Sequence, residues 1–263
     1  MITSVDVTQL GAGAAQALSA GSRGHVVVAS SRATYIRTQH GLAALTPPGT
    51  YPGPLHALLS RPILRFAAGT PIHVDRACVA IGDQLLLNLV DAEDWRGYMP
   101  QESELAAARL AAAEAAASVA TRSSLFSEPW AGATTGWTSA VAAGDLELLA
   151  SLVGGVGPGL TPSGDDVLAG TLLVARLLWG VSSVPRLVRC AATGRSSDLA
   201  VAFLFWAAQG QSLGPVHELF RAAVERRPAD ALECAQLVGE VGASSGADLC
   251  LGIARALESL PLT

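Results

Sequence analysis

Short apolar runs broken by polar positions dominate the first part of the chain. The runs His25–Ser30 and Ala33–Thr38 are typical of strands. The segment Pro71–Ala92 is predicted to form strands joined at its Gly-Asp dipeptide, a common hairpin turn. Thr46–Pro54 is rich in proline and glycine and is predicted to be a surface loop. The pattern therefore predicts a β-rich N-terminal domain.

From Gln101 onward the chain consists of alanine-rich and apolar stretches with short breaks. The run 102–122 predicts a helix that begins at Ser103 or a nearby polar residue. Further helices are predicted at Trp137–Ala143, Leu146–Val153, Asp165–Trp179, Ser197–Gln209, Pro215–Glu225, Ala229–Val241 and Ala247–Leu260. We therefore expect an α+β protein, with a β-rich domain at residues 1–97 and a helical domain at residues 98–263.

The segment 154–170, GGVGPGLTPSGDDVLAG, joins a glycine-rich loop to one of these helices. Glycines let backbone N–H groups approach a ligand closely. Ser163 is predicted as the helix N-cap, with Asp166 completing the Ser-x-x-acid capping pattern. A helix start has unpaired N–H groups and a partial positive charge, so it can hold a phosphate or carboxylate. The alternative is a plain turn whose acids favour the helix dipole without a ligand.

A second stretch, GASSGADLCLG at residues 242–252, repeats this pattern. Both stretches read Ser-Gly-x-Asp, then two apolar residues, one further residue and a glycine. Asp166 and Asp248 are expected at the third helical position. Gly170 and Gly252 follow one turn later, where another helix could pack closely. The repeat suggests a duplicated helical unit whose two N-termini lie close together and face one pocket. Two similar but unrelated caps are the alternative.

Composition and charge limit the class of protein. The 263 residues are 50% hydrophobic and 15% charged, which is typical of a compact globular chain with a sizeable core. The longest apolar run, 167–181, contains Arg176 and is shorter than a membrane span. The N-terminus lacks the pattern of a signal peptide. A net charge of −5 argues against a nucleic-acid surface. We expect a cytoplasmic protein that binds neither membranes nor nucleic acids.

The inventory of reactive side chains excludes several kinds of site. The four cysteines have no CxxC or Cys/His ligand spacing, and the five histidines form no metal spacing. The sequence therefore identifies neither a metal site nor a cofactor. All 17 basic residues are arginine, which excludes a P-loop lysine and a Schiff-base lysine. A bound anion must be held by backbone amides, hydroxyls, arginines or a metal.

The loop motif G-x-G-x-G-L-T-P-S-G-D-D, at residues 155–166, resembles the hallmark of a bacterial family long catalogued as a domain of unknown function. This family includes the AllH-type subunit of oxamate carbamoyltransferase, from anaerobic allantoin breakdown. SSGADLCLG, at residues 244–252, resembles the family's second Ser-Gly-x-Asp motif. The resemblance covers roughly the second half of the chain. It implies a subunit, working with partner subunits in purine catabolism, of an enzyme that transfers a carbamoyl group from carbamoyl phosphate to oxamate.

Both implied substrates are small anions, so two facing helix N-termini could hold one each. Preorganised N–H donors and an arginine would stabilise the charge of the transition state. Asp165 and Asp166 are the candidate catalytic residues, which could orient the attacking amide, bind a metal or only cap the helix. Arg195, Ser196 and Ser197 could add donors, although a simple cap is favoured there. The candidate substrate-binding residues are Gly157, Gly159, Thr161, Ser163, Gly164, Ser244, Ser245, Gly246 and Asp248.

Two other functions stay open. One is a non-catalytic scaffold that binds a small carboxylate or phosphate and docks partner subunits. The other, which is less favoured, is a small-molecule kinase. GPGLTPSG, at residues 157–164, faintly resembles the PxxxGLxSS loop whose amides wrap ATP phosphates in sugar and mevalonate kinases. Turnover by the chain alone, against turnover only with partner subunits, would separate an enzyme from a scaffold, and ATP binding would identify a kinase.

Overall fold

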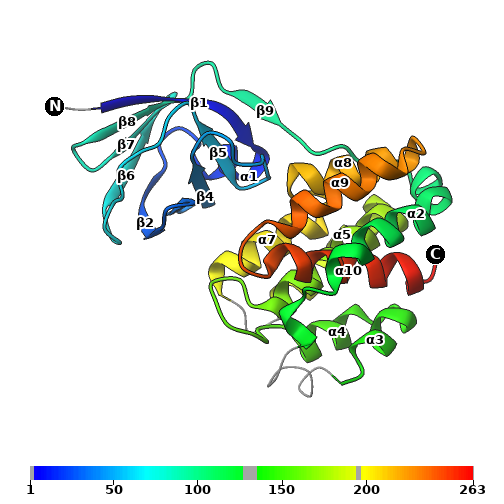
Figure 1. The fold of residues 1–263 in the computed structure, drawn as a ribbon. Helices are drawn as coiled ribbons and strands as arrows, with labels where there is room; N and C mark the ends of the chain where they lie inside the picture. Colours follow the sequence, from blue (N-terminus) through cyan, green and yellow to red (C-terminus); the bar gives the residue numbers. More distant parts are fainter. Residues whose placement is uncertain (1–2, 127–134, 194–196, 263) are drawn as a thin grey trace. The chain divides into compact units, whose positions relative to one another are not determined.

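A computed structural model describes residues 3–126, 135–193 and 197–262 (Figure 1). The chain divides into two compact units, Met1–Arg96 and Gly97–Thr263. Strands are the main elements of the first unit, and helices are those of the second. The α+β class expected from the sequence is therefore what the described residues form.

The first unit is a single sheet that closes on itself. Its strands run in the order β5-β4-β3-β2-β6-β7-β8-β1-β9, and an additional antiparallel pairing of β1 with β5 completes the ring. Strand β1 is parallel to both β8 and β9, whereas β6, β7 and β8 form antiparallel hairpins. The bounds are β1 Thr3–Gly11, β2 Arg23–Ala29, β3 Thr34–Thr38, β4 Gly41–Thr46, β5 His56–Leu59, β6 Pro71–Asp75, β7 Cys78–Ile81, β8 Leu85–Asn88 and β9 Glu93–Trp95.

Alternation of apolar and polar residues places one face of each strand in the core. In β6, Ile72 and Val74 are buried while the residues on either side of each are exposed. The predicted strands correspond to β2 and β3, and the predicted hairpin corresponds to β7 and β8. Their inward residues, with those of the short helix α1 at Ala12–Ala17, form one apolar cluster. The period of two in the sequence is therefore sufficient to identify these strands.

The loop predicted at Thr46–Pro54 contains no strand after Thr46, as expected, but its end is not on the surface. Gly53 and Pro54 are buried. The carbonyl oxygen of Pro54 accepts hydrogen bonds from the N–H groups of Gly13 at 2.7 Å and Ala14 at 3.0 Å. These amides belong to the first turn of helix α1, so the end of the loop is buried where it supplies an acceptor to a helix start. The expectation of a surface loop is wrong for this end.

The second unit is helical throughout the described residues. Each predicted helix is present, with its ends shifted by at most two residues, and α6 and two short 3₁₀ helices occur in addition. The bounds are α2 Glu102–Ala120, η1 Ser124–Phe126, α3 Trp137–Ala143, α4 Leu146–Val153, α5 Ser163–Trp179, η2 Val181–Ser183, α6 Val184–Thr193, α7 Asp198–Ala208, α8 Gly214–Val224, α9 Pro228–Gly239 and α10 Ser245–Ser259.

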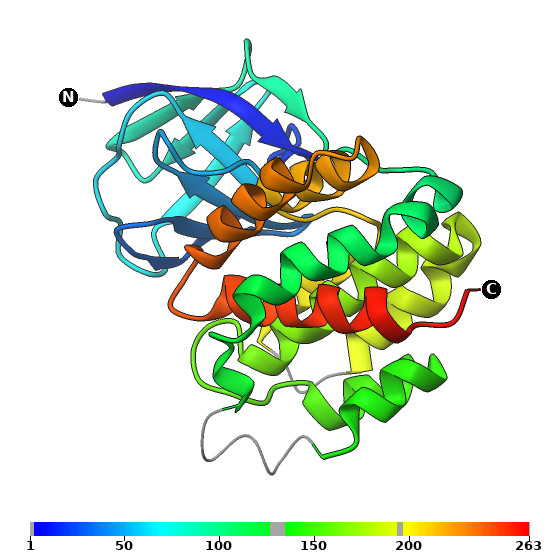
Figure 2. The ribbon, with the colours of Figure 1, turned by 45° about the vertical axis from the view of Figure 1, so that its right-hand side comes forward.

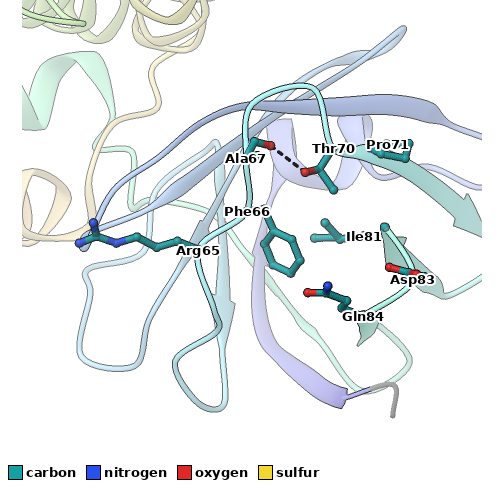
Figure 3. A pocket seen from close by; sticks show the side chains of 9 residues that line it. Arg65, Phe66, Ala67, Thr70, Pro71, Ile81, Asp83 and Gln84 are labelled. Atoms are coloured by element: carbon teal, nitrogen blue, oxygen red, sulfur yellow. Dashed lines mark hydrogen bonds between the residues drawn. The ribbon is translucent and has the colours of Figure 1, made fainter.

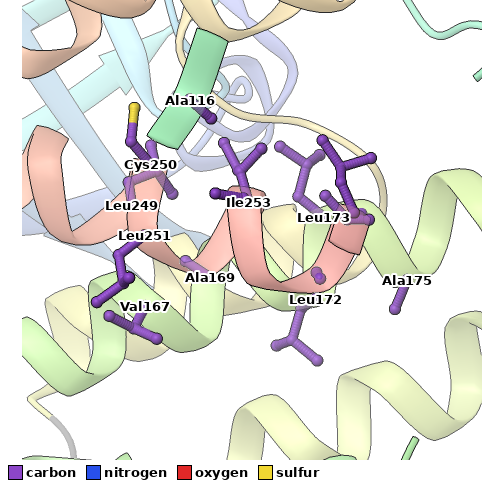
Figure 4. Packing of buried hydrophobic residues seen from close by; sticks show 14 of the residues in the cluster. Ala116, Val167, Ala169, Leu172, Leu173, Ala175, Leu249, Cys250, Leu251 and Ile253 are labelled. Carbon is purple, nitrogen blue, oxygen red and sulfur yellow. The ribbon is translucent and has the colours of Figure 1, made fainter. Parts of the chain in front are cut away.

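Helix α5 lies at the centre of this unit, and α10 crosses it while packing against α2 on its other side (Figures 1 and 2). Apolar side chains of both helices, including Val167 and Ile253, pack along the crossing (Figure 4). A Cβ added to Gly170 would lie 2.3 Å from the carbonyl oxygen of Leu249, and one added to Gly252 would lie 2.0 Å from that of Val167. The close packing predicted at these two glycines is confirmed.

Nothing in the described ranges has both the length and the apolar character of a membrane-spanning helix.

His217, on α8, is buried and uses both ring nitrogens. Nε2 accepts a hydrogen bond from the backbone N–H of Ser212 at 2.9 Å, so Nδ1 donates to the carbonyl oxygen of Tyr98 at 2.7 Å. Protonation would place a second N–H against the Ser212 donor. Burial lowers the pKa of His217 to about 4. The neutral ring therefore joins α8 to the segment that precedes α2.

The free energy of unfolding should fall as the pH is lowered from about 6.5 toward 4. In the unfolded chain His217 is protonated at its ordinary pKa, whereas in the folded chain it is protonated only near pH 4. The difference corresponds to about 3 kcal/mol at full effect. Urea denaturation over this pH range should show a shallower loss of stability in His217→Gln. The exposed control His73→Gln should keep the wild-type slope, and equal slopes in all three proteins would contradict the prediction.

Candidate functional site

The glycine-rich loop between α4 and α5 presents backbone donors. Gly157 and Gly159 have φ values of 113° and 103°, which side-chain-bearing residues rarely adopt. No described residue provides an acceptor for the N–H groups of Gly157, Gly159, Leu160, Thr161 or Ser163. The loop therefore offers a run of N–H groups of the kind that binds anions.

The start of α5 differs from the predicted cap. Pro162 occupies the N-cap position and Ser163 is the first helical residue, so Asp166 is the fourth helical residue and not the third. The prediction that Ser163 caps the helix is wrong. The extended backbone of Pro162 suits the residue before a helix, and Ser163 Oγ instead hydrogen-bonds Ser124 Oγ of η1.

The amides that follow Ser163 in the first turn of α5 are already paired. The N–H of Gly164 donates to the carbonyl oxygen of Val156 at 2.8 Å, and those of Asp165 and Asp166 donate to that of Pro162 at 2.9 Å and 3.1 Å. The backbone N–H groups available to an anion therefore lie mainly in the loop before the helix. This changes the predicted site, in which the bare helix start was to supply the donors.

The start of α10 repeats the arrangement at α5. The N–H of Gly246 donates to the carbonyl oxygen of Val241 at 3.0 Å, as that of Gly164 does to Val156. A Cβ added to Gly164 would lie 1.8 Å from the carbonyl oxygen of Val153, and one added to Gly246 would lie 1.8 Å from that of Val238. The starts of α5 and α10 therefore make the same backbone contacts, which supports the duplicated helical unit suggested by the sequence.

The sequence carries a further sign of this duplication that the motif comparison missed. VGGVG at residues 153–157 and VGEVG at residues 238–242 both read V-G-x-V-G. Each begins at a valine whose carbonyl oxygen packs against the glycine of the Ser-Gly pair that follows: Val153 against Gly164, and Val238 against Gly246. Five residues separate Gly157 from Ser163, but only two separate Gly242 from Ser245. This difference in loop length hides the repeat from a simple alignment.

Hydroxyl groups bring the two helix starts together. Ser124 Oγ hydrogen-bonds Ser163 Oγ and accepts from Ser244 Oγ at 3.2 Å. Thr161 Oγ1 lies 3.3 Å from Ser245 Oγ. The prediction that the two Ser-Gly pairs lie near each other is confirmed. Ser124 was missed, because nothing in its local sequence separates it from an ordinary serine at a helix end.

Two of the three acids at this place have defined hydrogen-bond partners. Asp248, which is fully buried, accepts hydrogen bonds from Ser123 Oγ, from the N–H of Ser124 at 3.0 Å and from Ser124 Oγ at 3.4 Å. Asp165, also buried, accepts from the N–H of Gly155 at 2.9 Å. Asp248 therefore fixes η1 against α10, and Asp165 fixes the glycine-rich loop against α5.

The environment of Asp166 differs from that of Asp248. The Oδ2 of Asp166, which is buried as the Oδ2 of Asp165 is, has no hydrogen-bond partner among the described residues. Burial raises the pKa of Asp166 well above the ordinary value. The hydroxyls of Ser245 and Thr161 lower this pKa, while the negative charges of Asp248 and Asp165 raise it further. Asp166 thus binds its proton far more tightly than a solvated aspartate does.

The remaining predicted donors fall in two groups. Ser197 caps α7, accepting from the N–H of Ala200 at 3.1 Å, and it also donates to the carbonyl oxygen of Leu160 at 2.6 Å. The favoured interpretation of Ser197 as a cap is confirmed, and the cap holds the glycine-rich loop. Arg195 and Ser196 lie outside the described residues. Within the described ranges, no cluster of three or more histidines, cysteines or acids could hold a metal ion.

A surface hollow occurs in the first unit. Arg65, Phe66, Thr70, Ile81 and Gln84 are among the residues that line it (Figure 3). None of its lining residues belongs to the motifs above. The hollow therefore adds nothing to the site built by the two helix starts.

Comparison with known proteins bears on the second unit. The family model described as oxamate carbamoyltransferase subunit AllH matches residues 152–257. No curated protein and no solved structure matches the chain. The matched segment begins at the end of α4 and includes both Ser-Gly-x-Asp motifs, whereas Ser123 and Ser124 precede it. Residues 152–257 of this chain therefore match the AllH family, as the glycine-rich motif predicted.

Proposed function

We propose that the chain is a subunit of an oxamate carbamoyltransferase and that the paired helix starts of α5 and α10 bind its anionic substrates. One observation supports this more than any other. Two equivalent helix starts, four hydroxyl-bearing residues of the predicted set and a loop of N–H donors converge within the segment that matches the AllH family. The four hydroxyls belong to Thr161, Ser163, Ser244 and Ser245.

The two halves of the site differ in what they offer to an anion. The longer half offers the N–H groups of Gly157, Gly159 and Thr161, three donors that suit the three oxygens of a phosphoryl group. The shorter half presents Ser244 and Ser245, which suit a carboxylate. We therefore assign carbamoyl phosphate to the loop before α5 and oxamate to the start of α10. Reaction between them gives oxalurate and phosphate.

Three of the candidate residues shape the site in this proposal without binding the substrate. Gly164 and Gly246 allow each helix start to pack against a backbone carbonyl, with no room for a Cβ. Asp248 holds Ser124 between Ser163 and Ser244. These residues shape the site and do not touch the substrate.

We also propose that the chain works in the cytoplasm with partner subunits of the transferase, in the breakdown of purine-derived allantoin. The family description names a subunit, which supports an assembly of different chains. Partners then complete the enzyme, and neither nucleic acid nor membrane is involved. Whether this subunit supplies all catalytic groups is decided by turnover in the assembled complex.

The Gly159→Val substitution should abolish stabilisation by carbamoyl phosphate. A Cβ at this position meets nothing closer than 3.9 Å, so the side chain would fit but would force a strained backbone and block the approach to the loop amides. Thermal unfolding should be measured with carbamoyl phosphate, phosphate and oxamate, in the presence of the partner subunits. Wild-type protein should melt at a higher temperature with carbamoyl phosphate, and Gly159→Val should not respond.

Gly49→Val is a matched control. Gly49 also has positive φ, at 81°, with open space around its Cβ position, but it lies in the first unit. The control should lose a similar amount of intrinsic stability, roughly 1–2 kcal/mol, and keep the full response to the ligand. If none of the three anions shifts the melting temperature of the wild-type complex, the anion site is excluded. Stabilisation without carbamoyl transfer would identify an anion-binding scaffold.

A further inference from the structure

We infer that Asp166 is the acid–base residue of this site, giving its proton to the departing phosphate and recovering one from the attacking amide. This inference rests on the proposed function and assigns to one residue the proton transfers that the reaction requires. It separates Asp166 from Asp165 and Asp248, although all three acids lie at the same paired helix starts.

The internal repeat makes the comparison between Asp166 and Asp248 direct. Both are the fourth residue of their helix, in equivalent helix–loop–helix units. Asp248 accepts three hydrogen bonds from Ser123 and Ser124. The Oδ2 atom of Asp166 is buried and has no partner among the described residues. Equivalent positions therefore carry one carboxylate that is saturated by donors and one carboxyl group that is not.

Asp165 also has a buried Oδ2, but its Oδ1 is committed to the loop, because it accepts a hydrogen bond from the N–H of Gly155 in the glycine-rich segment. Loss of this contact would release the loop from the helix, so Asp165 is a positioning residue. The same contact keeps its charge on the side of the loop, close enough to act on Asp166.

The environment of Asp166 favours the neutral carboxylic acid. Burial and the negative charges of Asp165 and Asp248 oppose its ionisation, and they outweigh the hydroxyls of Thr161 and Ser245. A neutral acid can donate a hydrogen bond to an anion, whereas an ionised one would repel it. This resolves the apparent conflict of a carboxyl group in a site for two anions.

The contact between the Thr161 and Ser245 hydroxyls, which lie next to Asp166, is weak enough for a substrate to displace. Thr161 Oγ1 and Ser245 Oγ are 3.3 Å apart, which is long for a hydrogen bond between hydroxyls. Thr161 belongs to the loop assigned to carbamoyl phosphate, and Ser245 to the helix start assigned to oxamate. A pair of substrates that displaces this contact would bring its reacting atoms to the Asp166 carboxyl group.

The proton transfers balance with one residue. The amide nitrogen of oxamate forms a bond to the carbamoyl carbon, and the bond from that carbon to the phosphate oxygen breaks, leaving its electron pair on the oxygen. Asp166 gives its proton to this oxygen. The resulting carboxylate takes the proton that the amide nitrogen loses. Asp166 ends as it began, and the products are oxalurate and hydrogen phosphate.

The proton on Asp166 can be measured in the full chain without substrate. Infrared spectra of the wild-type protein at neutral pH should contain the C=O band of a protonated carboxyl group. Asp166→Asn should lose this band, and Asp145→Asn should keep it. Asp145 is an exposed N-cap of α4, and asparagine caps a helix equally well. A wild-type spectrum without the band, or a band unchanged in Asp166→Asn, would overturn the inference.

Thermal unfolding gives a second measurement on the same proteins. Because the folded state holds the Asp166 proton more tightly than the unfolded state, wild-type stability carries a cost that grows as the pH rises above about 4. Asp166→Asn removes this cost. The melting temperature of the variant minus that of the wild type should therefore increase from pH 4 to pH 7. A difference that does not change with pH would overturn the inference.

Turnover is then measured in the assembled enzyme with carbamoyl phosphate and oxamate. Asp166→Asn should lower kcat at least about 100-fold, and Asp145→Asn should not change it. Turnover of Asp166→Asn within a few fold of the wild type would overturn the acid–base role while the proposed function stands. A wild-type complex that transfers no carbamoyl group would overturn the proposed function itself, whatever the infrared result.

Discussion

The Gly170→Ala substitution is expected to lower the free energy of unfolding of the helical unit by about 2–3 kcal/mol. On helix propensity alone, the same substitution would raise it by about 1 kcal/mol. The sign of the effect therefore distinguishes packing from propensity. Gly170→Leu, with a larger side chain at the same place, should prevent the unit from folding.

The expected loss follows from the backbone atoms around the crossing of α5 and α10. A Cβ on Gly170 would lie 2.3 Å from the carbonyl oxygen of Leu249 and 2.8 Å from the nitrogen of Ile253. Backbone atoms within a helix cannot turn aside as a flexible side chain can. The two helices must move apart, and the tightly packed apolar cluster along both of them would open.

Chemical denaturation of single and double variants tests this account. Gly252→Ala should cost a similar amount, because its Cβ would lie 2.0 Å from the carbonyl oxygen of Val167 in the mirrored contact. Once one substitution has separated the helices, the second meets less obstruction. The loss in the double variant should therefore be clearly smaller than the sum of the single losses. A gain in stability from Gly170→Ala would contradict the close crossing.

Helices of the second unit were predictable because their signals are local. Alanine-rich and apolar stretches define α2 to α5 and α7 to α10 without knowledge of any partner. Helix α6 was not predicted. Pro185 is its second residue, and only Leu187, Cys190 and Ala191 are buried. A short helix with a narrow apolar face and a proline at its start looks like a loop in the sequence.

The closed sheet illustrates what local patterns leave undetermined. Strand β1 pairs with β5 through residues such as Val7 and Leu59, which are far apart in the sequence. Strand β4 was within a stretch given no assignment, and β5 follows a loop whose end proved to be buried. Alternation identifies a strand, but it does not state which strand will be its neighbour.

The repeated spacing predicted which segments of the chain lie close together. The repeated Ser-Gly-x-Asp pattern brought Ser163 and Ser245 into one hypothesis, and their hydroxyl contacts bear this out. It could not reveal Ser123 and Ser124, which η1 supplies from a separate part of the chain. Nor could it rank the acids, because hydrogen-bond partners separate Asp166 from Asp248 while their sequence motifs are alike.

Asp248→Ala is expected to lower the free energy of unfolding by about 3 kcal/mol, because a buried acceptor of several hydrogen bonds is removed. The N–H of Ser124 and the hydroxyl of Ser123 would then be left without their acceptor in the interior. Asp145→Ala removes an aspartate that caps α4 at the surface and should cost only about 1 kcal/mol. Denaturation curves of the two variants would show whether this ordering holds.

Part of the stability lost in Asp248→Ala should also be lost in Ser123→Ala. If the two side chains act through one hydrogen bond, Ser123→Ala should destabilise the wild type but cost little more in the Asp248→Ala protein. Additive losses would contradict the link between η1 and α10. The link matters beyond stability, since η1 carries the Ser124 hydroxyl that joins Ser163 to Ser244. Asp248→Ala should therefore weaken stabilisation by carbamoyl phosphate in the complex, even at temperatures where the variant remains folded.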